Sequence, residues 1–269
     1  MREVAKSADS GRLRVEREGV VATLVFDNPN RRNAMTLAMW EDLARVAERF
    51  VGDTGVRVVV LRGAGERAFV SGADISEFQD LRDGAAQAER YGHAVARAEA
   101  AVGALPQPTV ALIQGYCIGG GVGIALRADL RVANDTAEFA LTPARLGLGY
   151  PAEDVAALHR LVGPAFTADM LYTARRVPAE EALARGLCQR VIPASGFDRE
   201  AGDLIASIAA HAPLTLRAVK ATLRDLARPE AERDPAATAA LVAACFDSAD
   251  YREGQAAFTQ KRAPRFEGR

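Results

Sequence analysis

Apolar residues recur along this chain with two periods, a period of two that is typical of strands and a period near 3.6 that is typical of helices. Residues 13–16 and 20–26 flank the polar segment 17–19, which predicts a β-hairpin. Thr36 precedes a run with helical spacing, and its hydroxyl is expected to cap the helix. The apolar stripe of that helix consists of Leu37, Trp40, Leu43, Ala47 and Phe50.

Short apolar runs and helical segments then alternate. Residues 56–61 form a β-branched run typical of a buried strand, and residues 68–74 after it are expected to form a loop. The alanine-rich segment 91–105 is interpreted as a packing helix. Further strands are predicted near 109–113, 130–133, 138–141 and 187–192, and helices from Ala152 onward.

From Phe197 to the C-terminus the pattern is helical and shows no strand signal. Alternating strands and helices followed by a helical tail favour an α/β fold with a helical C-terminal subdomain. The small and turn-forming residues at 193–196 are the expected boundary. We therefore divide the chain into a core of residues 1–195 and a helical subdomain of residues 196–269.

A glycine triplet, Gly119-Gly120-Gly121, lies between the apolar run at 110–113 and the helix-like segment 122–126. Such a turn brings bare backbone N–H groups and the positive end of a helix dipole to one place, where they suit a developing negative charge. No Ser, Cys, His, Asp or Glu lies between Gly119 and Leu126. A dinucleotide-binding fingerprint is disfavoured, because its spacing requires glycine where Ile124 or Leu126 stands.

A second small-residue turn, residues 71–74, follows the run at 56–61 and again precedes a helix-like segment. Two such turns at strand ends can meet over one pocket, and each can aim one N–H group at the same oxygen. Two converging donors form an oxyanion hole, in which each donor is worth roughly 2.7–4 kcal/mol of transition-state stabilisation. Without this second turn, the triplet would be read as a tight turn with no chemistry.

The composition of the chain limits which kinds of binding partner are expected. The chain has 269 residues, is 49% hydrophobic and carries a net charge of −1, so neither nucleic acid nor an anionic membrane is an expected partner. No apolar run approaches the roughly 18 residues of a membrane span, and no signal peptide is expected. The three dispersed cysteines (Cys117, Cys188, Cys245) predict buried thiols in a reducing cytoplasm. The three histidines form no metal-ligand pattern, so no metal site is expected.

Taken together, these segments resemble the enoyl-CoA hydratase/isomerase (crotonase) superfamily, in family order over nearly the whole chain. The matching segments are Asn28-Pro29 with 31–34, 71–75, Gly115-Tyr116 with 119–121, Ala128-Asp129, Leu146-Gly147, 179–182 with Gly186-Leu187, Glu253-Gly254 with Ala257-Phe258, Lys261-Arg262, Pro264 and Phe266. The resemblance implies a spiral of ββα units whose helical C-terminus packs in trimers, as a homotrimer or homohexamer.

The resemblance also implies a ligand and the groups that hold it. The ligand would be an acyl-CoA thioester, and the backbone N–H groups of Ala73 and Gly120 would hold the thioester oxygen as it becomes an enolate. No cofactor is implied other than the coenzyme A that the substrate carries. The residues that match the family's CoA contacts are Arg32, Ala34, Ser71, Asp74 and Ile75, and, often from a neighbouring subunit, Phe258 and Lys261. Asp74 is equally expected to cap the following helix and stabilise the turn.

The sequence departs from the family pattern at both usual hydratase glutamates. Gly123 and Pro143 stand in their places, and neither residue can take or give a proton. Glu153 and Asp154 lie nearby in the family pattern and are the candidate acid/base residues. The alternative is that both are first-turn acids of a helix at 156–161, favoured there by the helix dipole.

The expected function is therefore that of an enoyl-CoA hydratase/isomerase-like enzyme working through a stabilised enolate. One alternative is isomerisation, decarboxylation or thioester hydrolysis on the same fold. Another is a non-catalytic acyl-CoA-binding protein that kept the pocket and lost its acids.

Overall fold

The computed structural model describes residues 11–74, 77 and 85–269; Ile75 lies outside this part of the chain. The strands are β1 (Arg12–Glu18), β2 (Val21–Asp27), β3 (Val58–Gly63), β4 (Ala68–Val70), β5 (Thr109–Ile113), β6 (Tyr116–Ile118), β7 (Leu130–Asn134), β8 (Glu138–Ala140), β9 (Val177–Pro178) and β10 (Arg190–Ile192). The α-helices are α1 (Leu37–Phe50), α3 (Ala85–Ala104), α4 (Gly120–Arg127), α5 (Pro143–Leu146), α6 (Ala152–Thr173), α7 (Ala179–Ala184), α8 (Phe197–Ala210), α9 (Pro213–Leu226), α10 (Pro235–Asp247) and α11 (Ala249–Thr259).

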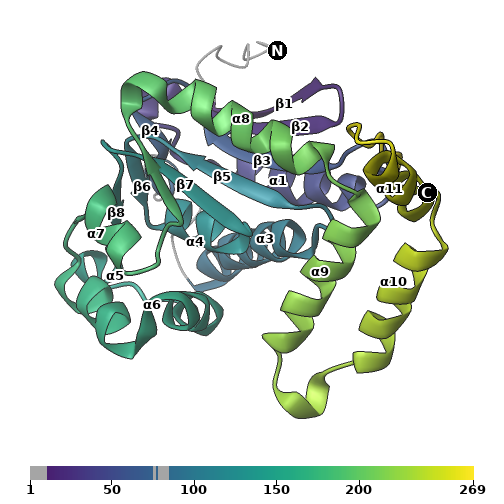
Figure 1. Cartoon of the computed structure of the whole chain (residues 1–269). Coiled ribbons are helices and arrows are strands. Elements are labelled where there is room, and N and C mark those ends of the chain that lie inside the picture. Colours follow the sequence, from purple (N-terminus) through teal and green to yellow (C-terminus); the bar gives the residue numbers. More distant parts are fainter. Residues whose placement is uncertain (1–10, 75–76, 78–84) are drawn as a thin grey trace, which may run out of the picture.

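These strands form two sheets that share one winding pattern (Figure 1). The six-stranded sheet has the order β1-β2-β3-β5-β7-β10, and the four-stranded sheet has the order β4-β6-β8-β9. After the β1–β2 hairpin, each of β3, β5 and β7 lies in the large sheet and is followed by a short strand in the small sheet and then by a helix. The predicted α/β spiral of ββα units is thereby confirmed, as are the hairpin and the helix that Thr36 caps.

The structure corrects the sequence prediction at two short strands. Residues 68–74 were expected to form a loop, but Ala68–Val70 is strand β4. The expected direct passage from the strand at 109–113 to the glycine turn is also wrong, because Tyr116–Ile118 forms β6 between them. Three residues are too few to show a period, and these strands form because each pairs in parallel with a neighbour far away in sequence.

Two apolar clusters hold the layers together. The larger one joins α1, α3 and α4 to one side of the sheets and includes Trp40, Phe69 and Phe139. The smaller one lies on the other side of the large sheet, where α8 crosses the strands (Figure 1) and buries Phe197 and Ala201. Within the part of the chain that the structure describes, no helix has the length and apolar character needed to cross a membrane.

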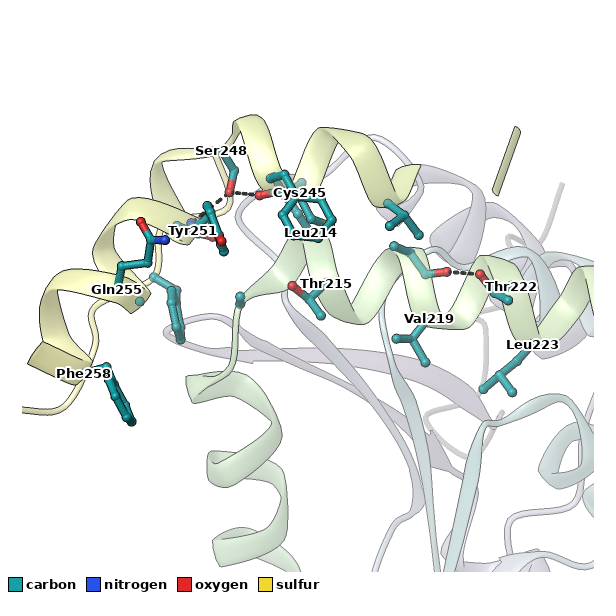
Figure 2. Close-up of a pocket in the computed structure, with 17 residues that line it drawn as sticks. Leu214, Thr215, Val219, Thr222, Leu223, Cys245, Ser248, Tyr251, Gln255 and Phe258 are labelled. Carbon is teal, nitrogen blue, oxygen red and sulfur yellow. Dashed lines mark hydrogen bonds between the residues drawn. The ribbon is translucent and has the colours of Figure 1, made fainter. Parts of the chain in front are cut away.

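The last three helices enclose a groove of about 680 Å³ with an almost wholly apolar lining (Figure 2). Figure 2 shows the lining residues Leu214, Val219 and Leu223 along α9 and Tyr251 and Phe258 along α11. Helix α10 forms another side, and none of its residues is buried. Cys117 and Cys188 are buried as predicted. Cys245 is only half-buried and lines this groove, so the prediction of three buried thiols is wrong there.

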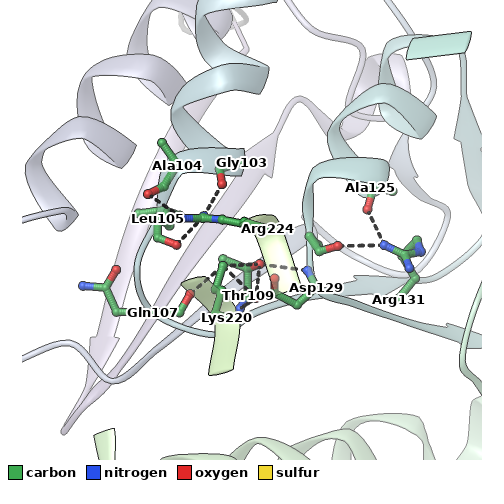
Figure 3. Close-up of polar contacts among 11 residues, drawn as sticks. Gly103, Ala104, Leu105, Gln107, Thr109, Ala125, Asp129, Arg131, Lys220 and Arg224 are labelled. Atoms are coloured by element: carbon green, nitrogen blue, oxygen red, sulfur yellow. Dashed lines mark hydrogen bonds and ion pairs between the residues drawn. The ribbon is translucent and has the colours of Figure 1, made fainter. Parts of the chain in front are cut away.

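Helix α9 is fixed to the core by two basic side chains (Figure 3). Lys220 is buried, and its Nζ donates to Gln107 O at 2.7 Å and Thr109 Oγ1 at 3.2 Å and pairs with Asp129 Oδ2 at 2.7 Å. Burial lowers the pKa of Lys220 to about 8, against the opposing effect of Asp129. One turn later, Arg224 donates to the carbonyl groups of Gly103, Ala104 and Leu105, which satisfies the C-terminal end of α3.

We expect Lys220→Ala to lower the free energy of unfolding by about 3 kcal/mol, because it leaves the polar groups around Asp129 without their buried cation. The measurement is urea unfolding at one fixed protein concentration. Arg217→Ala, on the same helix and half-buried, is the matched control and should change stability by no more than about 0.5 kcal/mol. Equal effects of the two substitutions would contradict a role for Lys220 as the anchor of α9.

Candidate functional site

The two small-residue turns meet because the strands before them are neighbours. Strands β4 and β6 pair in parallel, so their carboxyl ends lie at the same edge of the small sheet. Residues 71–74 follow β4, and Gly119 follows β6. A Cβ atom placed on Gly119 would lie 3.8 Å from Gly72 Cα. The structure therefore brings the two turns into contact, as the sequence predicted for two turns at strand ends.

Each turn presents a backbone N–H group that makes no backbone hydrogen bond among the described residues. Met35 N donates to Gly72 O at 2.8 Å, and Asp74 N donates to Met35 O at 2.9 Å. The residue between them, Ala73, points its own N–H to the opposite side of this parallel bridge. Gly120 is the first residue of α4, where backbone N–H groups have no partner within the helix. These are the two donors that the resemblance assigned to the oxyanion hole.

Glycine is needed in this turn for two separate reasons. Gly119 adopts φ 55° and ψ −117°, a conformation that side chains other than hydrogen rarely allow. Gly121 lies against β4 so closely that a Cβ atom there would be 2.3 Å from the Val70 carbonyl oxygen. The start of α4 is thus held against the strand that carries the other turn, which fixes the relative position of the two donors.

The residues that match the family's CoA contacts on the first half of the chain lie together beside these turns. Ser71 N donates to Arg32 O at 3.2 Å, and Asp74 Oδ1 pairs with Arg31 at 3.0 Å. Ala34 is buried, whereas Arg32 is exposed and places its guanidinium 5.1 Å from the centre of the Tyr116 ring. Asp74 thus stabilises the turn, consistent with the structural role expected for it.

Phe258 and Lys261 lie elsewhere on the chain. Phe258 lies at the end of α11 and Lys261 just after it. The C-terminal extension that follows is held at the amino end of β3 by a 2.5 Å hydrogen bond from Arg57 Nη2 to Phe266 O. The glycine turns lie beyond the carboxyl end of that strand, at the opposite end of the sheet from α11 (Figure 1). Phe258 is 87% exposed. Within one chain, the structure does not bring these two residues to the other predicted CoA contacts.

The two candidate acids lie in different surroundings. Helix α6 begins at Ala152, where the sequence predicted helical structure to start, and its first turn exposes Glu153 and buries Asp154. Asp154 Oδ1 forms a short ion pair with Arg127 Nη2, on α4. Pro143, which the resemblance aligned with one usual glutamate, begins the short helix α5. Burial and a fixed partner distinguish Asp154 from Glu153.

A third carboxyl group, which the sequence analysis did not identify, completes this cluster. Glu99 on α3 is 3% exposed, and its Oε2 accepts from Arg127 Nη2 at 2.8 Å. Burial and, next, the negative charge of Asp154 raise the pKa of Glu99 to about 8, against the opposing effect of Arg127. Its sequence signal was an acid within the buried stripe of an alanine-rich helix, between Ala98 and Ala101.

Comparisons with known proteins agree with this geometry. The profile of the family described as enoyl-CoA hydratase/isomerase matches residues 16–269. A carnitinyl-CoA dehydratase from Proteus mirabilis is 33% identical over 261 residues, which cover 96% of this chain and 98% of that protein. A short-chain-enoyl-CoA hydratase from Clostridium acetobutylicum is 28% identical over 92% of this chain and 94% of its own length.

Among solved structures, an enoyl-CoA hydratase/carnithine racemase from Magnetospirillum magneticum superimposes with a TM-score of 0.89 at 36% identity, covering 96% of both chains. Family profile, relatives and structural neighbour agree over nearly the whole length. This chain belongs to the enoyl-CoA hydratase/isomerase family, of the crotonase superfamily.

Proposed function

We propose that this protein polarises the carbonyl group of an acyl-CoA thioester with the backbone N–H groups of Ala73 and Gly120 and stabilises the enolate that results. The observation that carries the proposal is the contact between the two turns, with one unused donor in each. Two donors aimed at one oxygen are worth most where charge develops in the transition state. Proton transfer and polarisation suffice for this chemistry, so it needs no cofactor beyond the coenzyme A of the substrate.

Of the two acids that the sequence put forward, Asp154 is the better candidate. Its carboxylate is buried beside α4, whereas Glu153 is exposed on the outer side of α6. The usual pair of hydratase glutamates has no counterpart at Gly123 and Pro143. Double-bond migration through an enolate, which needs only one group to move a proton, is therefore favoured over water addition. Decarboxylation, thioester hydrolysis and acyl-CoA binding without turnover remain the alternatives.

We further propose that the chain works as a homotrimer, alone or as a pair of trimers. Apolar side chains are concentrated on the exposed faces of α9–α11, including Leu223 (63% exposed) and Phe246 (59% exposed). Such a patch marks a binding surface. A second copy is the occupant that would also bring its own Phe258 and Lys261 to the CoA site of its neighbour, which one chain cannot do.

The direct test is exchange of the α-proton of acyl-CoA thioesters with deuterium from solvent, followed by mass spectrometry, together with hydration of crotonyl-CoA. The expected result is exchange at the α-carbon of at least one thioester, because enolate formation labilises that proton. Binding of CoA thioesters with neither exchange nor hydration would reject the enzymatic proposal in favour of the acyl-CoA-binding protein.

Gly121→Ala should lower the exchange rate by about tenfold or more, because displacing a catalytic group by a fraction of an ångström is costly. The added Cβ cannot fit 2.3 Å from Val70 O, so α4 must move away from β4 and carry the Gly120 N–H with it. Gly202→Ala, in α8 with open space around the glycine, is the control and should leave the rate unchanged. If Gly121→Ala exchanged at the wild-type rate, the required spacing of the two donors would be refuted.

For the assembly, multi-angle light scattering should give three, or six, times the chain mass of 28.6 kDa. Leu223→Glu should dissociate the oligomer, because it places a charge in the apolar groove. Leu183→Glu on α7, where the leucine is 42% exposed and lies outside the groove, should leave the mass unchanged. A wild-type protein that is monomeric at micromolar concentration would count against the trimer.

A further inference from the structure

The carboxyl group of Glu99 occupies the space where a side chain at position 123 would begin. A Cβ atom placed on Gly123 would lie 2.2 Å from Glu99 Oε1 and 3.2 Å from its Cδ. Glu99 extends from α3 and Gly123 belongs to α4, and the two helices pack against each other. The missing side chain on α4 therefore makes room for a carboxyl group that arrives from the neighbouring helix.

This position is within reach of the proposed substrate. Gly123 follows Gly120 by three residues on one helix, and such neighbours have Cβ positions roughly 5–6 Å apart. A thioester oxygen bound by the Gly120 N–H lies about 2.9 Å from that nitrogen. The α-carbon of the acyl group is attached to the same carbonyl carbon, so it lies on the scale of one helical turn from the Glu99 carboxyl group.

Two buried polar atoms in this cluster have no partner among the described residues, Glu99 Oε1 and the Tyr150 hydroxyl. Buried polar groups are nearly always hydrogen-bonded, because an unpaired one costs about 1–3 kcal/mol. Tyr150 lies just before α6 and is close enough for the charges of Asp154 and Glu99 to raise its pKa, together with its burial. Both atoms therefore retain unused hydrogen-bonding capacity beside α4.

The charges around Glu99 favour a proton on it near neutral pH. Arg127 from α4 bonds to Glu99 and to Asp154 from α6, so one guanidinium serves two buried carboxyl groups. Tyr150 and Cys117 are further titratable groups close to this cluster. On the remaining side of α3, Glu48 of α1 pairs with Arg97 at the surface. Two carboxylates beside one guanidinium would leave one negative charge in excess. One proton shared between the two carboxyl groups removes it.

We propose that Glu99 is the catalytic acid and base of this protein, delivered from α3 to the place that Gly123 leaves open on α4. The proposal rests on the proposed function and names the group that performs its proton transfer. Asp154 and Arg127 are positioning residues: Arg127 holds Oε2 of Glu99, and the charge of Asp154 sets how readily Glu99 keeps its proton.

The proposed step balances with one proton and one electron pair. Glu99 as carboxylate takes a proton from the α-carbon, and the electrons of that C–H bond move through the carbonyl group to the oxygen held by Ala73 and Gly120. Glu99 as carboxylic acid then returns a proton to the α-carbon, or to the γ-carbon when a double bond lies between the β- and γ-carbons. Return of a proton to the α-carbon gives exchange, and return to the γ-carbon gives double-bond migration. Neither outcome changes the net protonation of the protein.

Glu99→Gln should reduce deuterium exchange at least 100-fold, because the amide keeps the shape but carries no transferable proton at this pH range. Circular dichroism and the melting temperature report whether the variant folds. A double variant, Glu99→Ala with Gly123→Glu, restores a carboxyl group from α4 in the vacated space and should recover part of the exchange. Exchange by Glu99→Gln at the wild-type rate would overturn the proposal, whereas wild-type protein without exchange would overturn the proposed function itself.

The pH dependence separates a proton-transfer role from a structural one. The exchange rate should rise with pH and reach half its maximum near pH 8, because the base form of Glu99 is required. Asp154→Asn removes the charge that raises the pKa of Glu99, so the midpoint should move to lower pH. If Asp154→Asn changes the rate but leaves the midpoint in place, Glu99 is a structural partner of Arg127 and the proposal is wrong.

Discussion

The packing of helix α4 against strand β4 is the constraint on which the rest of the site depends. At Gly121 the two backbones approach so closely that even a methyl group would meet Val70 O. The same contact places the first N–H groups of α4 beside the turn that follows β4. Since β4 and β6 are parallel neighbours, chain direction alone puts both turns at one edge. Sheet pairing and one missing side chain thus bring together the two turns whose N–H groups we propose as an oxyanion hole.

Close packing around α4 also explains how the proposed proton-transfer group can come from α3 instead of α4. Helix α3 lies along α4, and a carboxyl group from either helix can fill the space between them, but not one from both. With glycine at position 123, the carboxyl group of Glu99 fills this space. A glutamate at position 123 would displace that carboxyl group, because its Cβ atom would lie 2.2 Å from Glu99 Oε1. What the proposed reaction requires is a buried carboxyl group at a given point, and the fold offers two backbones from which to supply it.

Local signals in the sequence predicted most of the fold. The alternation of Leu13 to Phe26, the Thr36 cap and the glycine triplet each depend on neighbours within a few residues, and the structure contains the hairpin, the helix and the turn. Strands β4 and β6 were missed because three residues carry no period and their pairing is long-range. Glu99 was missed for the same kind of reason, since its proximity to Gly123 arises only when α3 and α4 pack.

Glu153 and Asp154 differ in burial because they lie at different angles around helix α6. Adjacent helical residues point about 100° apart, so one faces the core when the other faces solvent. The sequence predicted helical structure from Ala152 onward but not which of the two acids faces inward, and in the structure Asp154 is turned toward Arg127. With Asp154 inside and already paired, a second carboxyl group on the same guanidinium is the one that must carry a proton. That electrostatic competition gives the buried cluster a group able to gain and lose a proton near neutral pH.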